Sequence, residues 1–356
     1  MRIAQVAPLH ESVPPRSYGG TERIVFFLTE ELVKKGHDVT VYASGDSFTS
    51  AKLVPTIAQS LRLNPCCNDM VVPHILQLER LFQDNAHYDI VHFHTDYLHF
   101  PFSRRFLPNQ VTTLHGRLDI PELTMIFNEY SDMPVVSISD NQRLPLPMAH
   151  WQGTVYNGID APPYTFQPDR GRYMAFLGRI TQEKGIREAI EIALRCDTEL
   201  RIAAKIDLVE NVYYREHIEP YFDHPLITYV GEITELEKSA FLGNAAALLF
   251  PIQWPEPFGL VMIEALACGT PVIAFNKGSV PEVLENLING FIVDSVEEAV
   301  AAVGRLGAIS RHRCRESFEK RFTASRMTEG YLEVYRNLLT LSHVLPRQEA
   351  QADMRG

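Results

Sequence analysis

The sequence predicts an α/β protein made of two Rossmann-like domains in tandem, each a parallel sheet covered by helices. Short apolar runs typical of buried strands alternate with segments whose apolar residues recur at helical spacing. This series starts again near Tyr173, where a second strand, loop, helix and strand repeat the first set. The chain has 356 residues, and a single hydrophobic core usually organises no more than about 250–300. Two domains are therefore expected.

The first half begins with a buried strand followed by an amphipathic helix. Residues 2–8 are mostly apolar, and residues 21–35, TERIVFFLTEELVKK, place apolar side chains on one helical face. Lysines close that helix and Gly36 is a natural stop. Further strands are expected at residues 38–43, 90–93, 111–114 and 135–139.

The second half follows the same plan. Residues 173–179, YMAFLGR, predict its first strand, and residues 185–195 predict the helix that follows. Further strands are expected at residues 200–205, 227–230, 246–250, 271–274 and 290–293. Residues 325–343 predict a long terminal helix.

The domain boundary is expected within residues 157–172, which are rich in turn formers and lack periodicity. We therefore predict an N-terminal Rossmann-like domain over residues 1–160 and a C-terminal one over residues 161–324. A terminal helix over residues 325–345 is expected to pack back toward the N-terminal domain. A disordered tail is expected over residues 346–356.

Composition narrows the class of protein. Apolar residues make up 46% and charged residues 22%, as in ordinary globular proteins, and the formal charge of −11 disfavours nucleic acid and anionic membranes as partners. No run reaches the about 18–20 apolar residues of a transmembrane segment, and the start reads as a strand rather than a signal peptide. Five scattered cysteines without a CxxC pair fit a reducing compartment. These features predict a cytoplasmic protein.

The segment with the clearest chemical meaning is WPEPFGLVMIEALACGTP, residues 254–271. A Pro-rich turn follows an apolar strand, and a helix is predicted to begin near Gly259 and end at Gly269. The N-terminus of a helix presents unpaired N–H groups and a positive dipole, which suit a phosphate or a sugar oxygen. Glu264 lies about two turns into this helix on an otherwise apolar face. A carboxylate there needs a cationic partner, a ligand hydroxyl or a route to solvent.

Two cations follow the first strand of the second half. Arg179 and Lys184 come at the carboxyl end of a strand, where doubly wound domains bind ligands, and could converge on a diphosphate. The alternative is two solvated surface cations. In the first half, Gly19 and Gly20 open a helix and would allow close approach of a phosphate, although such a pair can also form only a turn.

Together these motifs resemble the retaining family 4 glycosyltransferases (glycosyl transferases group 1), which have the GT-B fold with two Rossmann-like domains facing across a cleft. The resemblance covers nearly the whole chain. It is carried by Gly19-Gly20, VYNGID at 155–160, FLGRITQEKG at 176–185, EPFGLVMIEALACGTPVIA with its E-x7-E pair at 256–274, and GSVPEVLENLINGFIV at 278–293.

The resemblance implies roles for the residues on the donor side. Arg179 and Lys184 would neutralise the leaving diphosphate, Glu256 would sit beside the donor sugar, and Glu264 would bind the ribose hydroxyls. The other donor-binding positions implied are Gly19, Gly20, Phe258, Gly259 and Leu260 near the sugar diphosphate, with Ile233 and Lys205 near the base.

The histidines are interpreted in two ways. By resemblance, His115 contacts the donor sugar or orients the acceptor. Many family members have Asp directly after this histidine, whereas this chain has Gly116, so the acidic partner of His115 stays open. The histidines of VHFHTDYLH, residues 91–99, are interpreted as buried structural residues rather than metal ligands. Glu282 is expected to cap or brace the next helix.

The resemblance implies retaining transfer of a hexosyl group from a nucleoside diphosphate sugar, with UDP-glucose the commonest donor by family frequency. The N-terminal domain would hold a small-molecule, lipid or glycan acceptor through residues 10–18 and 45–75, and the C-terminal domain would hold the donor. No DxD-like motif stands in the expected place, so we expect neither a metal nor another cofactor. A GT-B-type nucleotide-sugar epimerase and a non-catalytic nucleotide-sugar-binding protein remain alternatives. A nicotinamide-dependent oxidoreductase would need GxGxxG after the first strand, which HESVPPRSYGG lacks.

Overall fold

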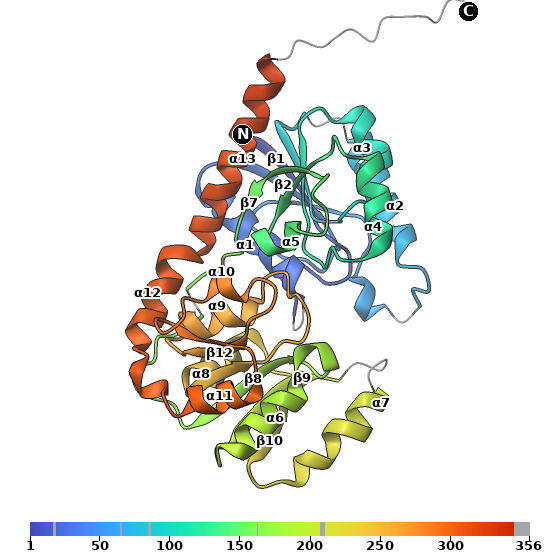
Figure 1. Cartoon of the computed structure of the whole chain (residues 1–356). Helices are drawn as coiled ribbons and strands as arrows, with labels where there is room; N and C mark the ends of the chain where they lie inside the picture. The colour runs from blue at the N-terminus through green and yellow to red at the C-terminus, as the bar shows by residue number, and fades with distance from the viewer. Residues whose placement is uncertain (17–18, 65, 85–86, 162, 207–210, 345–356) are drawn as a thin grey trace, which may run out of the picture.

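Two parallel sheets, one in each half of the chain, organise the computed structural model (Figure 1). The structure describes residues 1–16, 19–64, 66–84, 87–161, 163–206 and 211–344, so the tail expected over 346–356 lies outside the described residues. The first sheet has the order β3-β2-β1-β4-β5-β6-β7 and the second β10-β9-β8-β11-β12-β13. Their strands are β1 Arg2–Val6, β2 Asp38–Ala43, β3 Lys52–Pro55, β4 Ile90–Phe93, β5 Gln110–Thr113, β6 Pro134–Ser137, β7 His150–Thr154, β8 Tyr173–Arg179, β9 Leu200–Lys205, β10 Ile227–Gly231, β11 Ala245–Phe250, β12 Val272–Phe275 and β13 Gly290–Val293. The predicted α/β class with two Rossmann-like domains is confirmed.

Helices cover both sheets. The first domain contains α1 Gly20–Lys34, α2 Val71–Gln83, α3 Phe100–Phe106, α4 Pro121–Glu129 and α5 Asp140–Arg143. The second contains α6 Ile186–Arg195, α7 Asn211–Tyr213, α8 Glu235–Gly243, α9 Leu260–Ala267, α10 Val280–Val283, α11 Val296–Val303 and α12 Arg311–Arg321, and α13 Ala324–Val344 ends the described chain. No helix among the described residues is long and apolar enough to cross a membrane.

The sheet order places the same kind of feature in each domain. β1 pairs with β2 on one side and with β4 on the other, so the strand order reverses at β1. In the second domain β8 pairs with β9 and β11, so the order reverses at β8. Open α/β sheets bind ligands beyond the carboxyl ends of the strands at such reversal points. The loops after β1 and β8 are therefore the first places to search for a site.

Two crossing segments join the domains. Ile159, in the connection from the first domain to the second, pairs with Thr323, which precedes α13. The backbone N–H of Ile159 donates to the carbonyl of Phe322 (3.0 Å), and the N–H of Ala324 donates to the carbonyl of Ile159 (2.9 Å). α13 then runs from the second domain along the first, beside α1 (Figure 1). The last described helix is thus a structural part of the first domain.

Candidate active site

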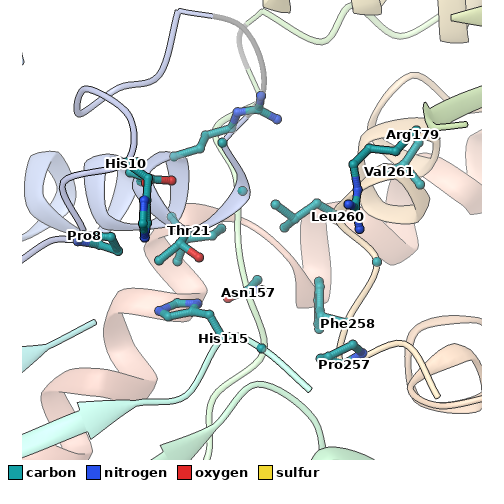
Figure 2. Close-up of a pocket in the computed structure, with 18 of the residues that line it drawn as sticks. Pro8, His10, Thr21, His115, Asn157, Arg179, Pro257, Phe258, Leu260 and Val261 are labelled. Atoms are coloured by element: carbon teal, nitrogen blue, oxygen red, sulfur yellow. The ribbon is translucent and has the colours of Figure 1, made fainter. Parts of the chain in front are cut away.

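A cleft of about 640 Å³ lies between the two domains. Both reversal points open into it, because the loop before α1 and the end of β8 contribute to its walls. Figure 2 shows Thr21, His115 and Asn157 across the cleft from Phe258, Leu260 and Arg179. Each predicted site residue lines this cleft: Gly19, Gly20, His115, Arg179, Lys184, Lys205, Ile233, Glu256, Phe258, Gly259, Leu260 and Glu264.

The floor of the second domain is the start of α9. Gly259 caps this helix with φ +79°, a left-handed conformation that an L side chain rarely adopts. The preceding turn is held by the loop after β12, where the Ser279 hydroxyl donates to the carbonyl of Phe258 (2.8 Å). Gly278 passes so close that a Cβ there would lie 2.4 Å from the backbone N and O of Glu256. These close approaches fix the α9 N-terminus and Glu256 in one geometry.

Lys184 and Glu256 form an ion pair at the edge of this turn. Their Nζ and Oε2 atoms are 2.6 Å apart, and both side chains are largely buried. The ammonium group also lies 5.4 Å from the centre of the Trp254 ring, within the range of a cation–π contact. Arg179 lines the same cleft as Leu260 and Val261, and Figure 2 draws all three on the side of the second domain. The structure therefore brings both predicted cations to the α9 N-terminus, where an anion would be favoured.

Glu264 is buried, with a relative exposure of 2%, and is paired rather than solvated. Its Oε1 lies 2.7 Å from Nη1 of Arg23 and 3.0 Å from Nζ of Lys238, and it accepts from the Tyr164 hydroxyl (3.1 Å). Burial alone would raise the pKa of Glu264, but the charges of Lys238 and Arg23 outweigh it and hold the pKa below its usual value. Within the described chain all these contacts fall on Oε1, which leaves Oε2 to a ligand hydroxyl.

Arg23 was missed by the sequence reasoning, although it joins the two domains at the site. It comes from α1 of the first domain, whereas Glu264 and Glu235 belong to the second. Lys238 was also missed; it bridges Glu235 (3.1 Å) and Glu264 on the same side. The sequence indicated only that the carboxylate of Glu264 needs a partner. It could not identify Arg23 as that partner, because the two residues are 241 positions apart.

On the first domain, the cleft is lined by a histidine and an aspartate, His115 and Asp96. His115 follows β5, and burial lowers its pKa to about 3, so the ring is neutral. Asp96 follows β4 with φ 49°, a strained conformation for a residue other than glycine. Asp96 is exposed to the cleft, and the surrounding protein desolvates its carboxyl group enough to raise its pKa to about 6, against the opposing effect of a hydrogen bond from the backbone N–H of His115. The acidic neighbour of His115, left open by the sequence, is thus Asp96 rather than Asp119, which instead pairs with Arg117.

Two further side chains offer unsatisfied polar atoms. Asn157, in the VYNGID segment, is 3% exposed, and its Oδ1 has no hydrogen-bond partner among the described residues. The Thr95 hydroxyl, beside Asp96, also lacks a partner in the described part of the chain. A buried polar atom without a partner is costly unless a ligand or water satisfies it. Both residues line the cleft, so they are candidate ligand contacts that the motif comparison did not single out.

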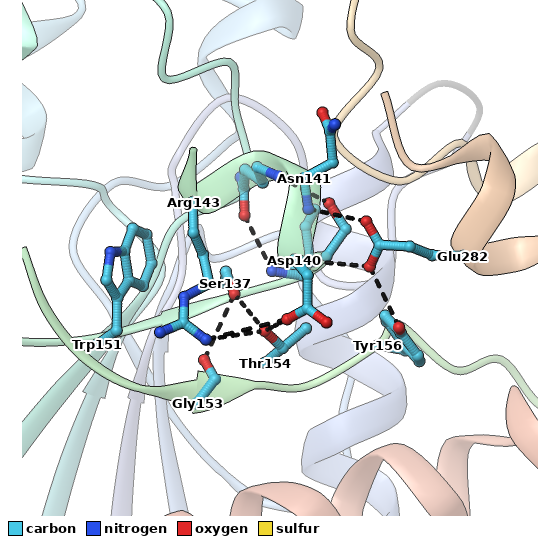
Figure 3. Close-up of polar contacts among 12 residues, drawn as sticks. Ser137, Asp140, Asn141, Arg143, Trp151, Gly153, Thr154, Tyr156 and Glu282 are labelled. Carbon is cyan, nitrogen blue, oxygen red and sulfur yellow. Dashed lines mark hydrogen bonds and ion pairs between the residues drawn. The ribbon is translucent and has the colours of Figure 1, made fainter. Parts of the chain in front are cut away.

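Glu282 corrects an expectation. It does not brace the helix that follows it in sequence; its carboxylate accepts from the backbone N–H groups of Asp140 (2.7 Å) and Asn141 (2.8 Å), at the start of α5 in the other domain. Tyr156 donates to the same carboxylate (3.1 Å), as Figure 3 shows. The expected local role was wrong because Glu282 lies inside the four-residue helix α10, and its carboxylate instead accepts from N–H groups at the start of α5 in the other domain.

The facing domains, the helix N-terminus and the two cations define a GT-B enzyme class. Two family models match consecutive parts of the chain: Glycosyltransferase Family 4 over residues 18–161 and Glycosyl transferases group 1 over residues 163–321. A curated relative, the glycogen synthase of Mycobacterium tuberculosis, is 26% identical over 97% of this chain and 100% of its own.

Solved structures agree on the fold. A sucrose-phosphate synthase from Thermosynechococcus elongatus has a TM-score of 0.78 at 18% identity, covering 96% of this chain and 100% of that one. HepE from Anabaena, in complex with UDP and glucose, has a TM-score of 0.72 at 16% identity, covering 95% and 100%. The chain belongs to the group 1, family 4 glycosyltransferases and is a glycosyltransferase of the GT-B fold.

Proposed function

We propose that this glycosyltransferase transfers a hexosyl group, with retention of configuration, from a nucleoside diphosphate sugar to a hydroxyl-bearing acceptor. The observation that carries the proposal is the convergence of Lys184 and Glu256, which form an ion pair of 2.6 Å, beside the α9 N-terminus. UDP-glucose is the donor we propose to test first, because a structural neighbour, HepE, is described with UDP and glucose.

The donor would bind mainly to the second domain. Its diphosphate would lie at the α9 N-terminus, where Arg179 and Lys184 supply positive charge, and Gly20 would approach it from the first domain. Glu264 would offer Oε2 to a ribose hydroxyl while Arg23 and Lys238 keep the carboxylate ionised. Arg179 and Lys184 would stabilise the departing diphosphate, and electrostatic stabilisation of this kind is often the largest part of catalysis.

The acceptor would meet the donor sugar beside the first domain. Asp96 and Asn157 line this part of the cleft, and the Oδ1 of Asn157 has no hydrogen-bond partner among the described residues. We propose that Asp96 binds the attacking hydroxyl and that the leaving phosphate accepts its proton. Front-face substitution without a protein nucleophile, and without a divalent cation, is part of this proposal.

Donor binding gives the first test. UDP-, GDP- and ADP-sugars are added to the protein at saturating concentration, and a ligand present at about 100 times its Kd should stabilise the folded state by about 2.7 kcal/mol. We expect one nucleotide series to raise the melting temperature. The Lys184→Ala variant should lose this shift, because the cation that meets the diphosphate is gone. Lys34→Ala is the matched control, since Lys34 is exposed at the far end of α1.

Turnover gives the second test. Release of nucleoside diphosphate should depend on acceptor and should persist in EDTA, and NMR of the product should show the anomeric configuration of the donor. Consumption of donor without an acceptor would identify an epimerase or a hydrolase instead. No stabilisation by any nucleotide sugar, with Lys184→Ala equal to the wild type, would contradict the donor site.

A further inference from the structure

The cleft residue His115 is connected to the C-terminal helix by a chain of buried hydrogen bonds. Nε2 of His115 is 2.9 Å from Nδ1 of His94, and Nε2 of His94 is 2.8 Å from Oε1 of Gln5. Nε2 of Gln5 donates to the hydroxyl of Tyr335 on α13 (3.2 Å). Gln5, His94 and Tyr335 are each at most 2% exposed. The two bonds made by Gln5 are fully buried, and the bond between His94 and His115 is partly buried at the cleft wall.

The direction of each proton follows from the chemistry of the groups. An amide oxygen only accepts, so His94 must carry its proton on Nε2, facing Gln5. A neutral imidazole has one N–H, so Nδ1 of His94 is an acceptor and must receive the proton on Nε2 of His115. His115 is neutral, which leaves a lone pair on its Nδ1. That Nδ1 has no hydrogen bond to any residue in the described part of the chain.

The other side of the chain fixes the orientation of Gln5. Tyr335 accepts the amide N–H and donates its own proton to Nδ1 of His92 (2.7 Å). His92 then donates from Nε2 to the hydroxyl of Thr113 (2.7 Å), which donates to Tyr331 (3.0 Å). Reversing the Gln5 amide would set two acceptors, its own oxygen and the Tyr335 oxygen, against each other. The alternative is to turn around every later proton in the chain, including the donation from Thr113 to Tyr331.

We propose that Gln5 and His94 are positioning residues that hold His115 in the tautomer protonated on Nε2. Nδ1 of His115 then accepts a hydrogen bond from a hydroxyl group of a sugar bound in the cleft. The second part rests on the proposed transferase function, whereas the tautomer itself is a property of the free protein. The first strand and the terminal helix thereby set the chemistry of a side chain that neither of them touches at the cleft.

Gln5→Leu tests the proposal without altering a cleft residue. Without the amide oxygen, His94 can move its proton to Nδ1 and donate to His115, which must then carry its proton on Nδ1. Long-range ¹H–¹⁵N spectra of histidine-labelled protein distinguish the two tautomers, and His115→Gln assigns the signals. The wild type should be protonated on Nε2 and Gln5→Leu on Nδ1. Adding His94→Asn to the Gln5→Leu protein should restore the wild-type tautomer. The amide oxygen of the new asparagine can still accept from Nε2 of His115.

The functional consequence is measured on the same variants. We expect kcat to fall about 10- to 100-fold in Gln5→Leu, the usual effect of losing a partner that orients a functional histidine. The double variant Gln5→Leu/His94→Asn should recover most of this lost kcat. Weaker binding of UDP-glucose but not of UDP would place the hydroxyl on the donor sugar; unchanged donor binding with lower kcat would place it on the acceptor. A His115 protonated on Nδ1 in the wild type, or the same tautomer and kcat in Gln5→Leu, would overturn the proposal. A correct tautomer with no turnover of any nucleotide sugar would count against the proposed function instead.

Discussion

At the scale of single residues, the site contains buried charged side chains. Burying any one of them alone would cost free energy, and the ion pairs between them offset that cost. Glu264 is buried against Arg23 and Lys238, which also meet Glu235. A buried carboxylate survives in the ionised form only because opposite charges and the Tyr164 hydroxyl replace its water. The arrangement that prepares Glu264 for a ribose hydroxyl therefore also contributes to holding the two domains together.

Glu264→Gln should destabilise the protein, because it leaves two buried cations facing one remaining carboxylate. Breaking a buried ion pair by removing one partner costs about 3–5 kcal/mol. Adding Arg23→Met to Glu264→Gln removes one uncompensated cation and should recover part of that loss. Urea unfolding of the wild type, the two single variants Glu264→Gln and Arg23→Met, and the double variant measures both effects. Glu199→Gln is the control, since its pair with Arg201 is partly exposed and should be worth less than about 1 kcal/mol. Additive single and double changes would contradict this account.

At the scale of secondary structure, the cleft depends on helix ends that are satisfied from the opposite domain. The first N–H groups of α5 have no partner within the helix, and Glu282 of α10 supplies a carboxylate to two of them. Ser139 accepts from the N–H of Gln142, so the remaining turn is capped locally (3.1 Å). α5 is thus completed only when the domains are close together.

Glu282→Gln should loosen this contact, because an amide can point its oxygen at one N–H group but not accept from both equally. We expect a loss of about 1–2 kcal/mol and a more open average shape, seen as a larger radius of gyration in X-ray scattering. A saturating donor should reverse the change. Glu285→Gln, three residues later, is the control, since Glu285 pairs with Arg321 inside the second domain. An unchanged radius in Glu282→Gln would show that this contact does not hold the domains.

The elements themselves were largely predictable from the sequence. Buried parallel strands such as β1, β8 and β11 are apolar on both faces, so their runs stand out against the polar loops. The two edge strands β3 and β7 were missed because they are short and half-exposed, without a continuous apolar run. For the same reason residues 45–75, expected to be loop, contain β3, the 3₁₀ turn Leu61–Leu63 and the start of α2.

The candidate site was predictable where it depends on one short segment. Gly259 and Glu256 lie within four residues of each other, and the helix start they form is visible in the sequence. Contacts between segments far apart, such as Arg23 with Glu264 or Glu282 with α5, leave no local pattern. The role of Asp96 was hidden for another reason: its left-handed backbone, rather than its residue type, turns it toward His115.

At the scale of the whole molecule, the two domains should respond differently to acid. His92, His94, His99 and His115 all belong to the first domain, and burial lowers each pKa from its usual value of 6.5. Burial also lowers the pKa values of three more histidines in this domain, His10, His37 and His74. Folding therefore releases protons below pH 6.5: the stabilisation is fully present above this value and falls as the pH drops toward the lower pKa values of the folded state. Asp96 and Glu22, whose pKa values are raised by desolvation, act in the opposite direction and offset part of this loss.

We expect acid to unfold the first domain before the second. At pH 5.5 each buried neutral histidine should reduce stability by about 1.4 kcal/mol, or about 5.6 kcal/mol for His92, His94, His99 and His115 together. His10, whose pKa burial lowers to about 4, adds to this loss. The chain has two tryptophans, Trp151 in the first domain and Trp254 in the second, so Trp254→Phe and Trp151→Phe variants report on one domain each. Between pH 7.5 and 5.5, the urea midpoint seen by Trp151 should fall much further than that seen by Trp254. In the Trp254→Phe protein, adding His99→Phe should shrink the fall in stability by about 1.4 kcal/mol, the contribution of one buried neutral histidine. Equal shifts for both tryptophans would mean that the interdomain contacts of Arg23 and Glu282 keep the two domains in a single cooperative unit at this pH.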